Sequence, residues 1–212
     1  MAGAIIVHTG PMKSGKTLAL LNAYYSAVYA GKAAKLFYPA DTNRWGDNEI
    51  VSRAFGDNQK ISAAATELKR GFATTANCAD LVNLNNQFIG FDEAQFLDIS
   101  FVKLISDLRD HGDNVIHISG LDMDYNGIPF GTMPYFMAIA DQVIKYTATC
   151  ADCKEAAQHS WYDDADHKGV EHIGDELYSC CCHDCFGAKH AERTEREMAT
   201  MTAQSEGLWT IK

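Results

Sequence analysis

Short apolar runs alternate with longer amphipathic segments over the first two-thirds of the chain. The apolar runs are rich in β-branched and aromatic residues, which predicts buried strands at 4–9, 34–38, 87–91, 114–119 and 141–147. The segments between them have the composition or the apolar spacing of helices at 17–25, 77–86, 101–109 and 134–140. This alternation predicts an α/β fold in which a mostly parallel sheet is covered by helices on both faces. Between 48 and 75 the periodicity is weak and predicts a loop-rich stretch.

A glycine loop separates the first predicted strand from the first predicted helix. Residues 10–17 read G-P-M-K-S-G-K-T, which is the phosphate-binding P-loop motif in the strand–loop–helix context that it requires. Gly10 and Gly15 let backbone N–H groups close on phosphate oxygens, and the helix N-terminus adds positive potential. Lys16 brings a charge to the β- and γ-phosphates, and the Thr17 hydroxyl is a ligand for Mg²⁺.

Two acidic residues follow another buried strand. Asp92 and Glu93 come directly after 87–91, and ligands of open α/β sheets bind at the carboxyl ends of the strands. We therefore expect Asp92 to hold Mg²⁺ directly or through water. The adjacent Glu93 is a candidate acceptor for the proton of an attacking group.

Two loops follow other predicted strands and lie at the same edge of the predicted sheet. In the loop 41–47, Asp41 and Arg44 are placed to reach phosphates, although Arg44 taken alone is more typical of a solvated surface charge. The loop 121–131 carries Gly, Pro and aromatic side chains. These aromatic side chains suit a flat, ring-shaped ligand, and they are equally consistent with side chains that pack inward.

Six of the seven cysteines lie in the last third of the chain. Cys150 and Cys153 form one C-x₂-C pair, and Cys182 and Cys185 form another, each with the bite that tetrahedral Zn²⁺ requires. The 28 residues between the pairs exceed the common spacing of about 15–20, so we expect an inserted loop. Four thiolates leave no open position, which indicates a structural site. One alternative is free or redox-active thiols. Within a zinc site, Cys180 or Cys181 would shift the register of the second pair, and His167, His172 or His183 would replace one thiol.

Composition and charge limit the class of protein. With 212 residues, of which 47% are hydrophobic, the chain has room for one ordinary domain and a small appendage. The formal net charge of −10 argues against a nucleic-acid partner, because binding to a phosphate backbone requires clustered Lys and Arg. No apolar run of about 18 residues and no leader-like N-terminus is present, so we expect a cytoplasmic protein with no membrane partner.

Taken in order, these motifs resemble one family, the small (type II) thymidine kinases that carry a zinc ribbon. The resemblance runs from residue 4 to about 186 and rests on 10–17, 41–44, 91–96, 120–131 and the four cysteines. Between the cysteine pairs, 170–174 and Tyr178 resemble the family's lasso, a segment that closes over the base. The resemblance implies a P-loop domain at 1–148, a zinc-ribbon and lasso domain at 149–187, and a helical or loose tail at 188–212.

The resemblance also implies an ATP-dependent nucleoside kinase of nucleotide salvage and DNA synthesis. It would transfer the γ-phosphoryl group of ATP to the 5′-hydroxyl of thymidine, giving thymidine monophosphate. Glu93 would be the general base, while Lys16, Arg44 and Mg²⁺ would stabilise the charge on the transferred group. The implied residues for ATP and its Mg²⁺ are Gly10, Pro11, Met12, Lys13, Ser14, Gly15, Lys16, Thr17, Asp41, Asp92 and Gln95. The implied acceptor-binding residues are Met12, Phe96, Leu121, Tyr125, Phe130, Val170, Glu171, His172, Ile173, Gly174 and Tyr178.

Members of this family are homotetramers, and many are inhibited by the end product thymidine triphosphate, so the resemblance implies both properties. Two other functions stay open. The first is a kinase for another pyrimidine deoxynucleoside, such as deoxyuridine. The second is a zinc-ribbon P-loop ATPase that acts with nucleic acid, against which the acidic net charge argues.

Overall fold

A six-stranded parallel sheet forms the body of the protein. The structure, a computed structural model, describes residues 3–40, 42, 48–52, 60–74, 78–81, 83–162 and 178–208. The strand order is β5-β2-β6-β7-β1-β8, and every neighbouring pair is parallel. The strands are β1 (Ala4–Thr9), β2 (Ala34–Pro39), β5 (Thr66–Leu68), β6 (Phe88–Phe91), β7 (Val115–Gly120) and β8 (Gln142–Lys145). The predicted parallel α/β sheet is thus confirmed.

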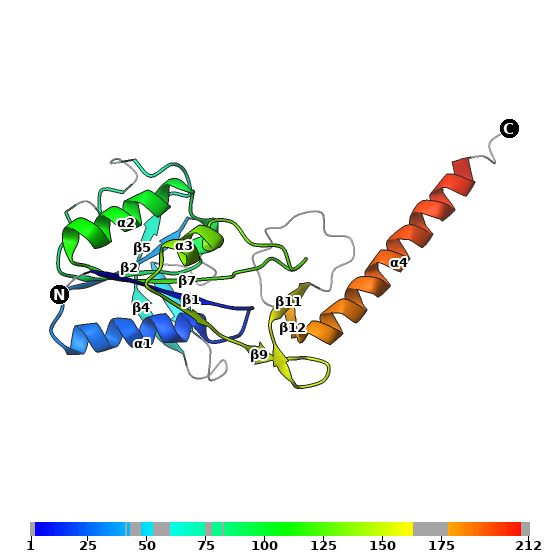
Figure 1. The fold of residues 1–212 in the computed structure, drawn as a ribbon, viewed down its shortest axis with the longest axis horizontal. Coiled ribbons are helices and arrows are strands. Elements are labelled where there is room, and N and C mark those ends of the chain that lie inside the picture. Colours follow the sequence, from blue (N-terminus) through cyan, green and yellow to red (C-terminus); the bar gives the residue numbers. More distant parts are fainter. Residues whose placement is uncertain are drawn as a thin grey trace.

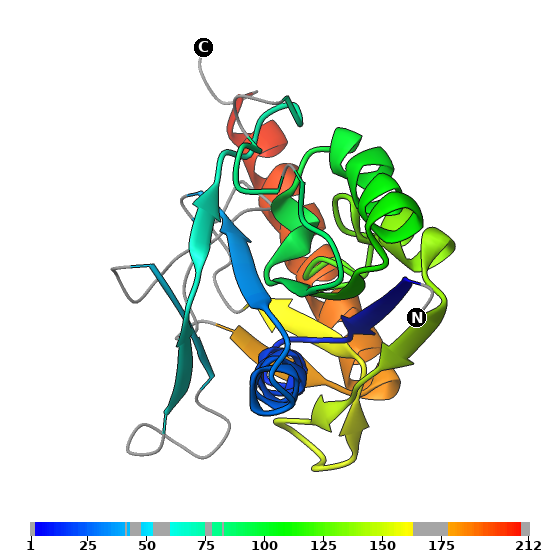
Figure 2. The ribbon, with the colours of Figure 1, turned by 90° about the vertical axis from the view of Figure 1, so that its left-hand side faces the viewer.

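Helices cover both faces of this sheet. Figures 1 and 2 show α1 (Lys16–Tyr29) on one face, and α2 (Ser100–Gly112) and α3 (Met133–Ile139) on the other. Two apolar clusters correspond to the two layers. Leu20 and Leu21 of α1 pack with one face, while Phe101 and Ile105 of α2 pack in the larger cluster on the other face. Because α1 follows β1 through the P-loop, this packing fixes the start of α1 against the sheet.

The helix predicted at 77–86 is wrong over the part of that range that the structure describes. Residues 79–81 and 83 form turns, and no helix is assigned there. Leu81 and Leu84 are buried in the core, so their apolar character was a sound signal of burial. Asn83 and Asn86 have φ angles of 68° and 52°, and left-handed backbone of this kind interrupts a right-handed helix.

The stretch without clear periodicity contains a short hairpin. Strands β3 (Glu49–Ser52) and β4 (Ile61–Ala64) pair antiparallel and lie beside α1. Ile50 and Ala63 pack in the cluster that holds Leu20 and Leu21, and the Tyr25 hydroxyl donates to the carbonyl of Ser62. Sequence patterning missed these strands because E-I-V-S and I-S-A-A mix apolar residues with small and polar ones, which gives no clear apolar run.

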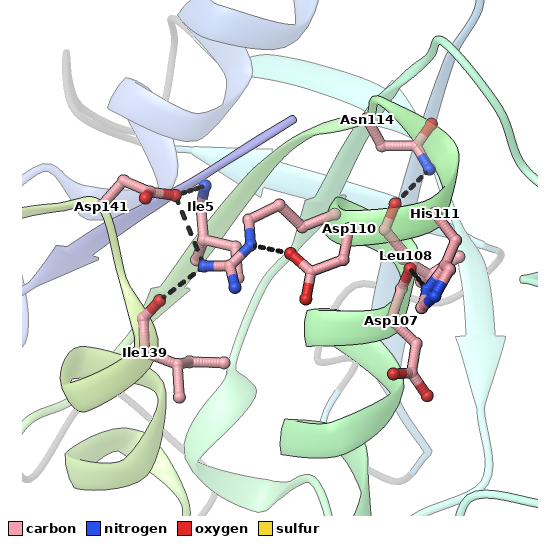
Figure 3. Close-up of polar contacts among 9 residues, drawn as sticks. Ile5, Asp107, Leu108, Asp110, His111, Asn114, Ile139 and Asp141 are labelled. Carbon is pink, nitrogen blue, oxygen red and sulfur yellow. Dashed lines mark hydrogen bonds and ion pairs between the residues drawn. The ribbon is translucent and has the colours of Figure 1, made fainter. Parts of the chain in front are cut away.

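Side chains tie the elements together at the amino-terminal edge of the sheet, opposite the P-loop. The guanidinium of Arg109, on α2, donates to the carbonyl of Ile139 at 3.1 Å and lies 3.7 Å from a carboxylate oxygen of Asp141. The same Asp141 oxygen accepts the N–H of Ile5 at 2.8 Å (Figure 3). Asn114, which is fully buried, donates to the carbonyls of Leu84 and Leu108, both at 2.8 Å. These bonds hold the amino-terminal edge of the sheet, and the P-loop lies at its carboxyl-terminal edge.

A small module follows the sheet and carries the long C-terminal helix. Its strands are β9 (Ala148–Thr149), β10 (Ala156–Ala157), β11 (His159–Tyr162) and β12 (Tyr178–Cys181). Helix α4 (His183–Leu208) begins inside the second cysteine pair, so the expected boundary at 187–188 falls within it. Figure 1 shows α4 extending away from the sheet. Within the described part of the chain, no helix combines the length and the apolar character needed to cross a membrane.

Buried His8 of β1 and half-buried His117 of β7 form a pair. His8 Nε2 lies 2.8 Å from His117 Nδ1, and His8 Nδ1 lies 2.9 Å from the hydroxyl of Tyr146. This bonding is typical of structural histidines. Burial lowers the pKa of His8 to about 4, and burial together with the His8 charge lowers the pKa of His117 to about 4.

We expect this pair to make stability depend on pH. The pKa values in the folded state lie below the unfolded value of about 6.5, so the neutral pair stabilises the fold fully above pH 6.5 and progressively less toward pH 4. Urea unfolding should show a loss on the order of 1–2 kcal/mol per histidine between about pH 7.5 and pH 5. The variant H8L/H117I should lose most of this slope, whereas H111Q, at an exposed position of α2, should keep it. An unchanged slope in H8L/H117I would contradict the assignment.

Candidate active site

The P-loop connects β1 to α1 through backbone conformations that favour glycine. Gly10 and Gly15 have φ angles of 136° and 89°, and a Cβ at Gly10 would collide with the carbonyl oxygen of Tyr146. The Lys16 ammonium donates to the carbonyl of Pro11 at 2.6 Å and is almost fully buried. Burial lowers the pKa of Lys16, and the negative charges of Glu93, Asp92 and Asp122 oppose that effect. A cation therefore lies at the loop, next to two carboxylates at the end of β6.

Asp92 lies where β6 and β7 end beside the start of α1. The Ser119 hydroxyl donates to Asp92 Oδ1 at 2.6 Å, and the Thr17 hydroxyl lies 3.4 Å from the same oxygen. Burial, and secondly the charge of Glu93, raise the pKa of Asp92 to about 6, while the bond from Ser119 and the Lys16 charge act in the opposite direction. A hydroxyl and a carboxylate side by side are oxygen donors of the kind that Mg²⁺ prefers. The sequence offered no signal for Ser119.

Glu93 is held by a neighbour two residues along the chain. Its φ angle of 50° places it in the left-handed region, between β6 and the short 3₁₀ helix η1 (Ala94–Phe96). The side-chain amide of Gln95 donates to Glu93 Oε2 at 2.6 Å and accepts the N–H of Leu121 at 3.0 Å. Both ends of this buried amide are thus engaged within the protein. Gln95 connects the carboxylate of Glu93 to the loop 121–131.

Aromatic and apolar side chains from three segments meet beside the P-loop. Met12 packs in one cluster with Tyr162 and Tyr178 of the β11–β12 hairpin, and Leu121 and Tyr125 pack against it. The rings of Tyr162 and Tyr178 are 4.9 Å apart between centroids. Of these residues, only Tyr162 was missed by the sequence analysis. It lies on the same face of β11 as Ser160, since side chains two apart on a strand share a face.

Phe96 of η1 and Phe130 of the loop 121–131 form a second aromatic contact. Their rings lie edge to face at 5.4 Å, and the guanidinium of Arg70 lies 4.7 Å from the centre of the Phe96 ring. Gly131 has a φ angle of 51°, and a Cβ there would collide with the carbonyl of Gln95. Glycine at this position lets the loop 121–131 approach η1 closely.

The four expected cysteines form one compact cluster. The Sγ atoms of Cys150, Cys153, Cys182 and Cys185 all lie within 4.8 Å of one another. Four sulfur ligands in this arrangement fit a tetrahedral Zn²⁺ site with no open position. Among the described residues, neither of the neighbouring cysteines and no histidine belongs to the cluster.

Those two neighbouring cysteines have other surroundings. The Cys180 thiol donates to the carbonyl of Met12 at 2.9 Å. Cys181 is buried against Trp161 and Phe186, and burial raises its pKa to about 11. Both surroundings are typical of structural thiols, and they leave Cys182 as the third member of the metal cluster.

A family model described as thymidine kinase matches residues 3–186, which is most of the chain. The chain belongs to the thymidine kinase family. Its relatives include thymidine kinases of Bacteroides fragilis, 34% identical over 195 residues, and of Porphyromonas gingivalis, 35% identical over 187 residues. The first match covers 92% of both chains, and the second covers 87% of this chain and 85% of the relative. The thymidine kinase of Mesomycoplasma hyopneumoniae is 40% identical over 156 residues, covering 73% of this chain and 79% of the relative.

Membership of a kinase family implies the use of ATP. The structure brings together five predicted site residues at the carboxyl edge of the sheet: Lys16, Thr17, Asp92, Glu93 and Gln95. It gathers Met12, Leu121, Tyr125 and Tyr178 beside them. Asp41, Arg44 and the segment 170–174 lie outside the described residues, so their predicted roles stay predictions.

Proposed function

We propose that the chain transfers the γ-phosphoryl group of ATP to the 5′-hydroxyl of thymidine, giving thymidine monophosphate. The observation that carries this proposal is the place of Glu93. Its carboxylate follows β6 next to Asp92 and the P-loop cation, and Gln95 joins it to a loop that contributes to an apolar, aromatic cluster. Thymidine is the acceptor because the named relatives are thymidine kinases and the chain matches them over most of their length.

The donor half of the site binds phosphate and stabilises charge. Lys16 and the N–H groups at the start of α1 would bind the β- and γ-phosphates of ATP. Thr17 and Asp92 would hold Mg²⁺, which supplies positive charge to the phosphates when it is bound. At neutral pH Asp92 is largely ionised, since its pKa of about 6 lies below that pH. Arg44 is proposed to add a further positive charge.

The acceptor half would present the nucleoside hydroxyl to Glu93. We place the base among Met12, Phe96, Leu121, Tyr125, Phe130 and Tyr178, with the lasso at 170–174 closing over it. Glu93 would take the proton from the 5′-hydroxyl as the oxygen attacks the γ-phosphorus and the bond to ADP breaks. Zn²⁺ at the four cysteines would hold the ends of the lasso. A homotetramer, inhibition by thymidine triphosphate and the three-part division of the chain belong to the same proposal.

Incubation of the pure, zinc-loaded protein with Mg-ATP and thymidine tests the proposal directly. We expect thymidine monophosphate and ADP in equal amounts, measured by chromatography. Assays with deoxyuridine, alone and in competition with thymidine, measure the acceptor range. A preference for deoxyuridine would make it the acceptor in place of thymidine. ATP hydrolysis that depends on DNA or RNA, with no monophosphate formed, would instead support the ATPase.

A further inference from the structure

The β11–β12 hairpin of the cysteine module is bonded directly to the P-loop. Ser160 and Cys180 lie opposite each other in the antiparallel pairing, so their side chains share one face of the hairpin. The Ser160 hydroxyl accepts the N–H of Met12 at 3.0 Å. The Cys180 thiol donates to the carbonyl of the same residue at 2.9 Å. One cross-strand pair thus binds both backbone groups of one P-loop residue, and both side chains are buried.

A third bond joins the same two segments. The ammonium of Lys13 donates to the carbonyl of Tyr178 at 2.7 Å. Lys13 itself has a φ angle of 59°, in a region that residues other than glycine rarely adopt. The loop is also bounded by Gly10 and Gly15, which have wide conformational freedom. Bonds from outside the loop restrict this conformational freedom.

The hairpin is well placed to provide such bonds because the cysteine cluster holds it at its base. The N–H of Ala151 donates to the carbonyl of Cys180 at 2.8 Å, which ties the first cysteine pair to β12. Cys182 follows β12 directly. On the opposite face of the hairpin, Trp161 packs against Phe186 of α4. Zn²⁺ bound by the four cysteines would therefore fix the strands that carry Ser160 and Cys180.

We propose that Ser160 and Cys180 are positioning residues for ATP. By bonding both backbone groups of Met12, they hold the P-loop in the shape that binds phosphate, so the zinc module serves the donor site as well as the acceptor pocket. The inference rests on the proposed binding of ATP at the P-loop. Its physical basis is preorganisation, since a loop that is already fixed loses less conformational entropy when its ligand binds.

Calorimetric titration with Mg-ATP, in the absence of any nucleoside, tests this proposal. We expect C180A and S160A each to weaken ATP binding by about 5- to 30-fold, because each leaves one buried backbone group of Met12 without its partner. C180S retains a hydrogen-bond donor and should restore affinity close to that of the wild type. In steady-state assays the KM for ATP should rise more than kcat falls.

The matched control is S179A, which removes a hydroxyl from the neighbouring position of β12, on the other face from Met12. It should bind ATP like the wild type. Zinc content and melting temperature are measured for every variant, so the comparison is made on folded, zinc-loaded protein. S160A, C180A and S179A each delete one side-chain heavy atom, and C180S only exchanges sulfur for oxygen. Wild-type affinity for ATP in zinc-loaded S160A and C180A would overturn the proposal. A wild-type protein that binds ATP and does not phosphorylate thymidine would contradict the proposed acceptor alone.

Discussion

Replacing Glu93 with glutamine should lower kcat for thymidine phosphorylation by about 10²-fold or more. Glutamine has the shape of glutamate and its amide oxygen still accepts the bond from Gln95, so the position of the side chain should be retained. What is lost is the ability to take the proton of the attacking hydroxyl. Steady-state kinetics measure kcat, and calorimetry with thymidine shows whether the nucleoside still binds.

The matched control for this variant is E67Q. Glu67 is an exposed acid on β5, another strand of the same parallel sheet. Its replacement changes the net charge by the same amount as E93Q and should leave kcat within about twofold of the wild type, the usual range for a surface change away from the site. Unchanged turnover in E93Q would remove Glu93 as the general base. The proton would then pass to another group.

Loss of the metal should have the second large effect, on stability. Cys150 is fully buried and belongs both to the cysteine cluster and to the apolar cluster that holds Met12, Tyr162 and Tyr178. Structural Zn²⁺ sites contribute on the order of 10 kcal/mol to the folding of small domains. Replacing Cys150 with alanine, or treating the wild type with a strong chelator, should therefore lower the melting temperature by about 10 °C or more.

Elemental analysis should show about one zinc per wild-type chain and far less in C150A. The control is C78A, which removes a buried thiol from the main core and leaves the cluster intact. It should keep its zinc and lose only about 1–2 kcal/mol through the small cavity. A C150A protein with full zinc content and the melting temperature of the wild type would show that these cysteines are not the metal site.

The elements that the sequence predicted well are those in which one local pattern is long enough to be read. β1, β2, β6, β7 and β8 each contain adjacent apolar residues that are β-branched or aromatic, and all lie in the central sheet. The helix expected at 77–86 was wrong because burial of Leu81 and Leu84 has the same signature as an amphipathic helix. Only the backbone at Asn83 and Asn86 reveals the turn.

The candidate site divides in the same way. The P-loop, the acidic pair after β6 and the two C-x₂-C pairs are local motifs, in which the chemistry requires fixed residue types at fixed spacing. Ser119, Ser160 and Tyr162 were missed because each acts on a residue far away in the chain. Ser119 donates to Asp92 across 27 positions, and Ser160 accepts from Met12 across 148.

By itself, the sequence determined the parallel fold, the phosphate loop, the pair Asp92 and Glu93, and the two C-x₂-C pairs. Each of these is specified by neighbours in the chain, whose spacing fixes their geometry. The tertiary structure decided how these parts act on one another: Gln95 joins Glu93 to the loop 121–131, and the β11–β12 hairpin bonds to Met12. Such contacts form only when distant segments are packed together. The residues next to a serine or cysteine in the chain do not indicate which distant group it will bond.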